Sequence, residues 1–235
     1  QDGDVRDILI IRRDIQWEIG LSIKHNHFAV KHSRLSGTID FGNSWFGVPC
    51  SQTYWDAVTP VFSFLNEEKK KGTKFSELDN KENDVYVPIL QAFIDENGLC
   101  DNVKILGSMP TEKVQKNMDN ADISLFTSDR REGWGAVVNE AMVGGCAVVA
   151  SDAAGSSKSL ITSGENGFVY HHPNKKEFIS YVLELAKNEA LREKIGINAN
   201  KTLVEIWNGT VGTKRLLDFS RAKLNKEELP KFEEG

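Results

Sequence analysis

Two adjacent stretches of sequence decide the fold: EGWGAVVNEAM at residues 132–142 and GGCAVVASD at residues 144–152. Gly133 and Gly135 have no β-carbon, so the backbone between them can adopt dihedral angles that other residues disfavour, and a ligand can approach the main chain closely. Good or tolerable helix formers fill residues 136–142, and the two glycines that follow are a helix stop signal. The pattern predicts a glycine-rich bend, then a helix, then a short apolar strand.

The predicted helix begins at the bend. Its first amide groups have no partner within the helix and carry the positive end of the helix dipole, which suits a diphosphate. Glu132 precedes the helix and Glu140 lies in its second turn, so the two do not form a helical i, i+4 pair. We expect the carboxylates to contact different parts of one elongated ligand, such as a sugar and a ribose. The alternative interpretation is two surface glutamates that flank a structural helix.

From residue 102 onward, predicted strands and helices alternate with short connections. This alternation is typical of a Rossmann-like α/β fold, with a parallel sheet and helices on both faces. Such a sheet binds ligands at the carboxyl ends of its strands. The loops predicted there cover residues 107–110, 127–135 and 152–157, and all three are rich in Gly, Ser, Thr or Asp.

The glycine-rich bend and its surroundings resemble the E-x7-E region of retaining glycosyltransferases of family four. The resemblance extends from about residue 102 to about residue 219. It implies a GT-B architecture, of which this chain carries the C-terminal, nucleotide-sugar-binding half, and a reaction that requires no metal or other cofactor. The resemblance makes Glu132 the catalytic residue, in contact with the transferred sugar. The donor-binding residues that it implies in this region are Gly133, Trp134, Gly135, Ala136 and Glu140.

The organisation predicted along the chain has four parts. Residues 1–18 align with the family's first strand and diphosphate loop, and the resemblance makes Arg13 the arginine that binds the diphosphate; a solvated arginine after a strand is the alternative. Glu18 stands where the family has a lysine, and a carboxylate repels a phosphate. Residues 19–84 are an unassigned insert or divergent segment, residues 85–222 form the nucleotide-sugar-binding domain, and residues 223–235 are a charged tail.

Within the unassigned segment, residues 36–47 carry three glycines at five-residue spacing and are predicted to form a loop or hairpin. Residues 25–32 alternate like a half-buried strand. The strand would place His25 and His27 on one face, but no carboxylate or cysteine partner is evident nearby, so we expect no metal site.

Composition narrows the classes of partner and location. The net charge of -5 and the pI near 5.6 argue against a nucleic-acid binder that relies on phosphate neutralisation. Three widely separated cysteines indicate neither a disulfide framework nor a zinc site. No apolar run approaches the roughly 18 to 20 residues that span a bilayer. We expect a cytoplasmic protein. Peripheral contact with the inner membrane surface is the alternative location.

The leading hypothesis is a glycosyltransferase that moves a sugar from a nucleotide-diphosphate sugar to an acceptor hydroxyl with retention. The expected acceptor is a saccharide or a lipid-linked molecule. Such an enzyme needs a second domain to hold the acceptor, supplied by an N-terminal domain, a partner chain or a reduced substitute at residues 19–84. The alternative is a nucleotide-sugar-binding module or inactive remnant that depends on a partner. A sugar-nucleotide epimerase on the same fold is a third hypothesis, against which the arrangement of Glu132 and Glu140 argues.

Overall fold

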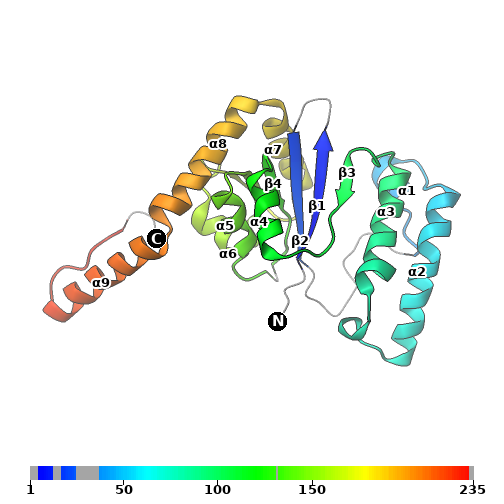
Figure 1. Cartoon of the computed structure of the whole chain (residues 1–235), viewed down its shortest axis with the longest axis horizontal. Helices are drawn as coiled ribbons and strands as arrows, with labels where there is room; N and C mark the ends of the chain where they lie inside the picture. The colour runs from blue at the N-terminus through cyan, green and yellow to red at the C-terminus, as the bar shows by residue number, and fades with distance from the viewer. Residues whose placement is uncertain (1–4, 13–16, 25–36, 131, 233–235) are drawn as a thin grey trace. The chain divides into compact units, whose positions relative to one another are not determined.

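The computed structural model describes residues 5–12, 17–24, 37–130 and 132–232 (Figure 1). The chain divides into two compact units. Unit 1 comprises Gln1–Ile11 and Lys24–Gly107, and unit 2 comprises Arg12–Ile23 and Ser108–Gly235. The glycine-rich bend and its helix belong to unit 2.

Unit 2 is built on a parallel sheet. Each neighbouring pair runs parallel, with Ser22 opposite Phe126 and Phe126 opposite Ala150. Every residue of the two central strands is buried, as expected for strands covered on both faces. The sheet confirms the predicted fold class. In spatial order its strands are β2 (Trp17–Lys24), β4 (Ile123–Phe126), β5 (Ala147–Ser151) and β6 (Phe168–Tyr170).

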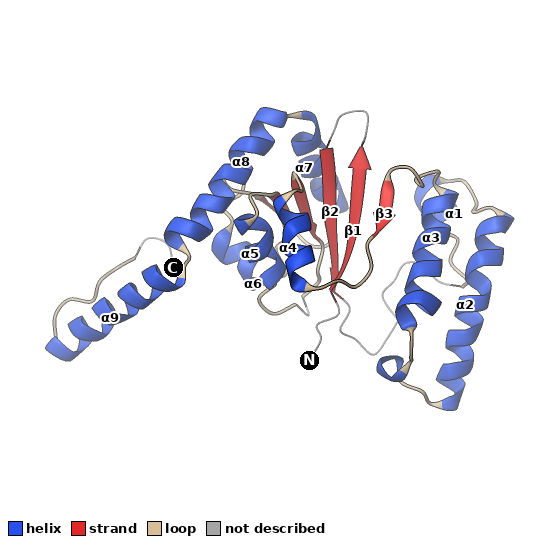
Figure 2. Ribbon diagram, in the orientation of Figure 1, coloured by secondary structure: helices blue, strands red, loops and turns tan. Residues whose placement is uncertain are grey.

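Helices lie on both faces of this sheet (Figure 2). Asn174 caps one of them, because its side-chain oxygen accepts a hydrogen bond from the amide of Glu177 over 3.2 Å. The helices are α4 (Thr111–Asp119), α5 (Ala136–Val143), α6 (Gly155–Leu160), α7 (Lys175–Lys187), α8 (Glu189–Lys201) and α9 (Gly209–Asn225), with a π-helical turn, η4 (Thr202–Ile206), before the last.

Unit 1 contains an antiparallel strand pair and a helical layer with its own core. Phe41 packs edge-on against Tyr54, with ring centroids 5.1 Å apart, and both side chains are buried. The elements are β1 (Val5–Arg12), α1 (Phe41–Phe46), α2 (Gln52–Lys71), the 3-10 turn η2 (Phe75–Glu77), the π-helical turn η3 (Glu82–Tyr86), α3 (Val87–Glu96) and β3 (Val103–Ile105).

Two predictions about local structure are wrong. Residues 36–47 were expected to be a loop or hairpin, but α1 occupies part of them, because Asp40 accepts a hydrogen bond from the Asn43 amide over 2.8 Å and Gly47 ends the helix at φ 71°. The strand β3 is present before the loop predicted at residues 107–110, but it pairs antiparallel with its neighbour β1, where a parallel strand was expected. A strand's own residues do not determine the direction of its partner.

Some predictions fall outside the described residues. Arg13 is one of these, as is the strand expected at residues 25–32. The backbone of Glu18 is described and lies in β2, so this residue is part of a strand and not of a loop. Among the helices that the structure describes, none combines the length and the apolar character needed to cross a membrane.

Candidate functional site

The glycine-rich bend connects the carboxyl end of β4 to the amino end of α5. Gly135 is the N-cap of α5 and has φ 81° and ψ 58°, in the left-handed region. A β-carbon at this position would lie 2.9 Å from Cζ of Phe126, 3.0 Å from Oγ of Ser156 and 3.1 Å from Cβ of Ala154. Both the backbone angle and the lack of space therefore require glycine here.

Three hydrogen bonds from the start of α6 hold the bend in place. The amide of Gly155 donates to the carbonyl of Gly133 over 3.0 Å, and the amide of Ser156 donates to the carbonyl of Trp134 over 2.8 Å. The hydroxyl of Ser156 donates to the carbonyl of Gly135 over 3.0 Å. Because β4 and β5 are parallel neighbours, their carboxyl ends meet, and the loop after one strand is bonded to the helix after the other.

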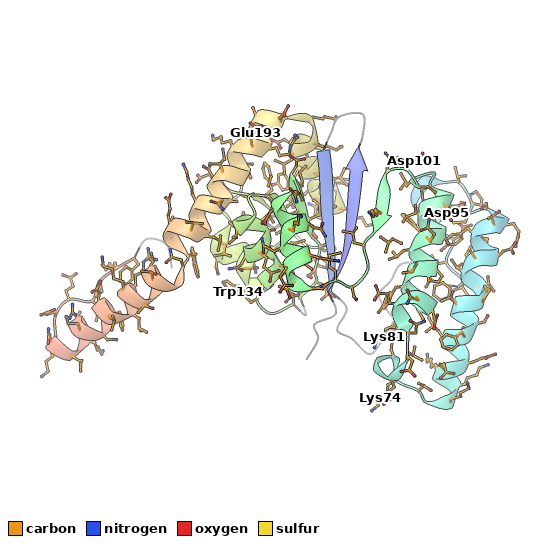
Figure 3. The ribbon with its side chains drawn as sticks, viewed as in Figure 1. Lys74, Lys81, Asp95, Asp101, Trp134 and Glu193 are labelled. Atoms are coloured by element: carbon orange, nitrogen blue, oxygen red, sulfur yellow. The ribbon has the colours of Figure 1, made fainter. Side chains whose placement is uncertain are left out.

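Trp134 lies at the edge of unit 2 (Figure 3). Its indole N–H donates to Oδ1 of Asn139 over 2.9 Å, and its ring lies 6.2 Å from the ring of Trp207. A β-carbon on Gly155 would sit 3.1 Å from Cε3 of Trp134, so the indole covers that glycine. The side chain is 42% exposed, which leaves part of the ring available to a ligand.

The first amides of α5 are available for an anion. The carbonyl of Gly135 accepts a hydrogen bond from the amide of Val138 over 3.0 Å, which is the first hydrogen bond of the helix. In the part of the chain that the structure describes, the amides of Ala136 and Val137 have no acceptor, as is usual at the first positions of a helix. Glu132 and Glu140 flank these amides in the sequence, and both are half-buried.

A second polar group at the same edge of the sheet was missed by sequence reasoning. The amide of Asp152 donates to the carbonyl of Tyr170 over 2.9 Å, and its carboxylate accepts a hydrogen bond from the amide of His172 over 3.0 Å. The His172 amide is the main cause that lowers the pKa of Asp152. His171 places its amide 2.7 Å and its Nδ1 3.1 Å from Oε2 of Glu177. The loop at residues 152–157 was predicted at this edge; its contact with residues 171–172 was not.

The bend is not part of either of two open grooves that the structure contains elsewhere in unit 2. One, of about 560 Å³, lies at the amino ends of β4 and β5 and includes the buried Arg192. The other, of about 1170 Å³, follows α9. Among the described residues, no group of three or more His, Cys, Asp or Glu side chains is arranged to hold a metal ion.

Two family models match the chain. The family described as Glycosyl transferases group 1 matches residues 88–202. The family described as HaeIII restriction endonuclease matches residues 1–138. The second match includes the segment at residues 19–84 that the sequence analysis leaves unassigned, and the two matches overlap at residues 88–138.

Individual relatives also fall into two groups, restriction enzymes and glycosyltransferases. The chain is 61% identical over 94 residues to the Type II restriction enzyme HaeIII of Haemophilus aegyptius, which covers 40% of this chain and 30% of the enzyme. It is 31% identical over 108 residues to the poly(glycerol-phosphate) alpha-glucosyltransferase of Bacillus subtilis (strain 168), covering 46% of this chain and 16% of that protein.

A solved structure supports the fold of unit 2. The crystal structure of Anabaena Alr3699/HepE in complex with UDP matches with a TM-score of 0.51 and 26% identity, over 61% of this chain and 38% of that one. The match agrees with the C-terminal domain of GT-B glycosyltransferases. The chain thus spans less than two fifths of each of these three proteins.

Proposed function

The chain belongs to the HaeIII restriction endonuclease family through residues 1–138 and carries a glycosyl transferases group 1 domain at residues 88–202, and we propose that this second domain supplies its activity. The proposed reaction transfers a hexosyl group from a nucleotide-diphosphate sugar to an acceptor hydroxyl, with retention of the anomeric configuration. The acceptor is a saccharide or a lipid-linked molecule.

One observation carries the proposal: Gly135 is left-handed and is hydrogen-bonded to α6, and among the described residues the amides of Ala136 and Val137, at the carboxyl edge of a parallel sheet, have no acceptors. Unpaired amides at a helix start bind a phosphate group without a charged side chain. They also stabilise the negative charge that develops on a leaving diphosphate. In this proposal the leaving group is neutralised by the main chain, and no metal or other cofactor takes part.

The side chains around the bend have separate roles in the proposal. Glu132 contacts the transferred sugar and supports the positive charge that develops at its anomeric centre. Glu140 accepts hydrogen bonds from the ribose hydroxyls of the donor. Trp134 positions the sugar through the exposed part of its indole, next to the amides of Gly133 and Gly135. Arg13, which is not among the residues that the structure describes, contributes to diphosphate binding.

The comparisons support this assignment at the level of the reaction class. The Bacillus subtilis relative is an alpha-glucosyltransferase by name, and the Anabaena structure holds UDP. We propose that an N-terminal domain or a partner chain holds the acceptor. We also propose that the protein acts in the cytoplasm, with peripheral contact at the inner membrane surface where the acceptor is lipid-linked.

A binding module without transferase activity is the alternative within the same class of ligand. Glu18 favours it, because a carboxylate stands where the family has a phosphate-binding lysine. The match of residues 1–138 to another family favours it too, since the glycosyl transferases group 1 model matches only from residue 88 onward. A module of this kind binds the donor and leaves its glycosidic bond intact.

DNA binding is a second candidate function, and the observation that favours it is the 61% identity to a Type II restriction enzyme. We place it second because the net charge of -5 opposes binding to a polyanion. The absence of nucleic acid among the partners therefore stays a prediction. Retention of labelled duplex DNA at 150 mM salt, or its cleavage with added Mg²⁺, would contradict it.

Calorimetric titration of the purified chain with UDP-, GDP- and ADP-sugars tests the leading proposal. We expect one donor to bind and to be hydrolysed slowly, with an anomeric configuration by NMR that matches the donor. Donor binding without hydrolysis or transfer would support the module. Failure of every nucleotide-sugar to bind would reject both the enzyme and the module.

Two variants test the assigned roles. Glu132→Gln should abolish donor hydrolysis and leave nucleotide affinity nearly unchanged, whereas Glu140→Ala should weaken nucleotide binding. Glu193→Gln is a matched control, because Glu193 lies on α8 at the opposite end of unit 2 from Trp134 (Figure 3). Equal nucleotide affinity in Glu140→Ala and Glu193→Gln would remove the ribose role.

A further inference from the structure

Two cationic side chains and a histidine lie near one carboxylate at the carboxyl edge of the sheet. Arg130 lies in the loop after β4, Lys158 in the helix that follows β5, and His171 in the loop after β6. Because these strands are consecutive parallel neighbours, the segments that follow them meet at one edge. The carboxylate is that of Asp152, directly after β5.

Asp152 is held in a fixed position and remains ionised. Its amide is bonded to the carbonyl of Tyr170, and its carboxylate accepts the amide of His172. This backbone hydrogen bond lowers the pKa of the carboxyl most, and the neighbouring Lys158, Arg130 and His171 lower it further. The carboxylate therefore lies within electrostatic reach of all three side chains.

The three side chains are not equivalent. His171 is engaged, since its Nδ1 lies 3.1 Å from Oε2 of Glu177. The side chains of Arg130 and Lys158 form no ion pair or hydrogen bond with any other residue that the structure describes, and both are exposed. Their guanidinium and ammonium groups are therefore open to an anionic ligand.

These two cations lie on segments that are joined at the bend. Lys158 lies three residues after Gly155, whose amide bonds the carbonyl of Gly133, and Arg130 lies three residues before that glycine. Both cations thus belong to the two segments that the α6 hydrogen bonds join. A guanidinium and an ammonium are the side-chain groups that bind phosphate oxygens most strongly.

We propose that Arg130 and Lys158 bind the phosphate groups of the donor. The assignment rests on the proposed function and extends it: the amides of Ala136 and Val137 contact the diphosphate from the main chain, and these two side chains supply its counter-charge. They take the place of the cation that is missing at Glu18. A guanidinium and an ammonium suit a doubly charged diphosphate better than a neutral sugar.

Titrations with inorganic pyrophosphate, UDP and uridine test the assignment, because the first probe carries only the phosphates and the last carries none. We expect Arg130→Gln and Lys158→Gln each to weaken pyrophosphate and UDP binding about tenfold, since a hydrogen bond to a charged group contributes somewhat more than the free energy of one tenfold step. Uridine binding should not change. Lys194→Gln, at an exposed lysine of α8, is the matched control.

The outcomes separate this assignment from the proposed function. If the unmodified chain binds neither pyrophosphate nor UDP, the proposed function fails and the assignment falls with it. If the unmodified chain binds UDP and both variants bind it equally well, only the assignment is overturned. A loss of uridine affinity as large as the loss of UDP affinity also overturns it, because the substitutions would then have disturbed the fold of the site.

Discussion

The hydroxyl of Ser156 donates a hydrogen bond to the carbonyl of Gly135 over 3.0 Å, and both residues are buried. The bond joins the first turn of α6 to the N-cap residue of α5. The same carbonyl also accepts a hydrogen bond from the amide of Val138, so one backbone oxygen takes part both in the first hydrogen bond of α5 and in the contact with α6. The shape of the bend therefore depends on α6 as well as on its own glycines.

Substitution of Gly135 by alanine should destabilise the protein by about 2 kcal/mol or more, since a left-handed residue costs roughly 1–2 kcal/mol and overpacking adds about 1–3 kcal/mol. Gly133→Ala is the matched control: it lies in the same bend, and a β-carbon there meets no atom within 4 Å. We expect the control to change the free energy of unfolding by less than about 0.5 kcal/mol. Urea unfolding of both variants measures the difference, and equal stabilities would show that the bend tolerates a side chain.

Much of unit 2 could be predicted because its local signals agree with its fold. Helices and strands alternate from residue 102 as predicted, with α4 as the first such helix, and the helix predicted from residue 136 begins there in α5. Each is set by the residues at its own ends, such as Gly135 at φ 81°. Strands β4 and β5 were predictable for a different reason: apart from Ser124 and Ser151 they consist of apolar residues, as is typical of buried parallel strands.

The helical layer of unit 1 was harder to predict. Tyr54, Val58, Val61 and Phe62 are buried at helical spacing in α2, but Pro60 lies among them and masks the pattern. The contact between Asp152 and His172 was missed for a physical reason as well. The two residues are 20 positions apart, and only the pairing of β5 with β6 brings them together. The match to the HaeIII restriction endonuclease family was not predicted, because no motif at residues 19–84 indicated a nuclease.

The neighbouring serines of α6 should respond differently to removal of their hydroxyl groups. Ser156→Ala loses the bond to Gly135 and should cost about 1 kcal/mol. Ser157 is equally buried, yet its hydroxyl has no partner among the described residues. Because an unsatisfied buried hydroxyl is unfavourable, Ser157→Ala should be neutral or stabilising. Thermal unfolding of both variants checks this, and equal losses of stability would mean that Ser157 has a bonding partner in solution.

Gly196 allows α8 to pack against the backbone of the loop before β5. A β-carbon at this position would overlap the carbonyl oxygen of Gly145. Alanine is favoured over glycine in a helix by about 1 kcal/mol, but relief of a backbone overlap costs about 1–3 kcal/mol, so Gly196→Ala should be destabilising on balance. Gly212→Ala, in α9, meets no atom within 4 Å and should be neutral or stabilising by up to about 1 kcal/mol. Chemical unfolding that ranks the two variants in the reverse order would contradict the close packing.

The three cysteines should differ in their reactivity toward a thiol reagent in the folded protein. Burial raises the pKa of Cys146 to about 12, and it is also the main cause that raises the pKa of Cys50. Cys100 is exposed, and its hydrogen bond to the carboxylate of Asp95 raises its pKa. Since the thiolate is the reactive form, an aromatic disulfide at pH 8 should label one thiol quickly and the other two only on unfolding.

Two variants identify the fast thiol and the cause of its pKa. Cys100→Ser should remove the fast phase of labelling. Asp95→Asn should accelerate it, because loss of the neighbouring carboxylate lowers the pKa of Cys100 and increases its thiolate fraction at pH 8. A fast phase that survives in Cys100→Ser would mean that a thiol of the core opens to solvent, and an unchanged rate in Asp95→Asn would show that the hydrogen bond does not form in solution.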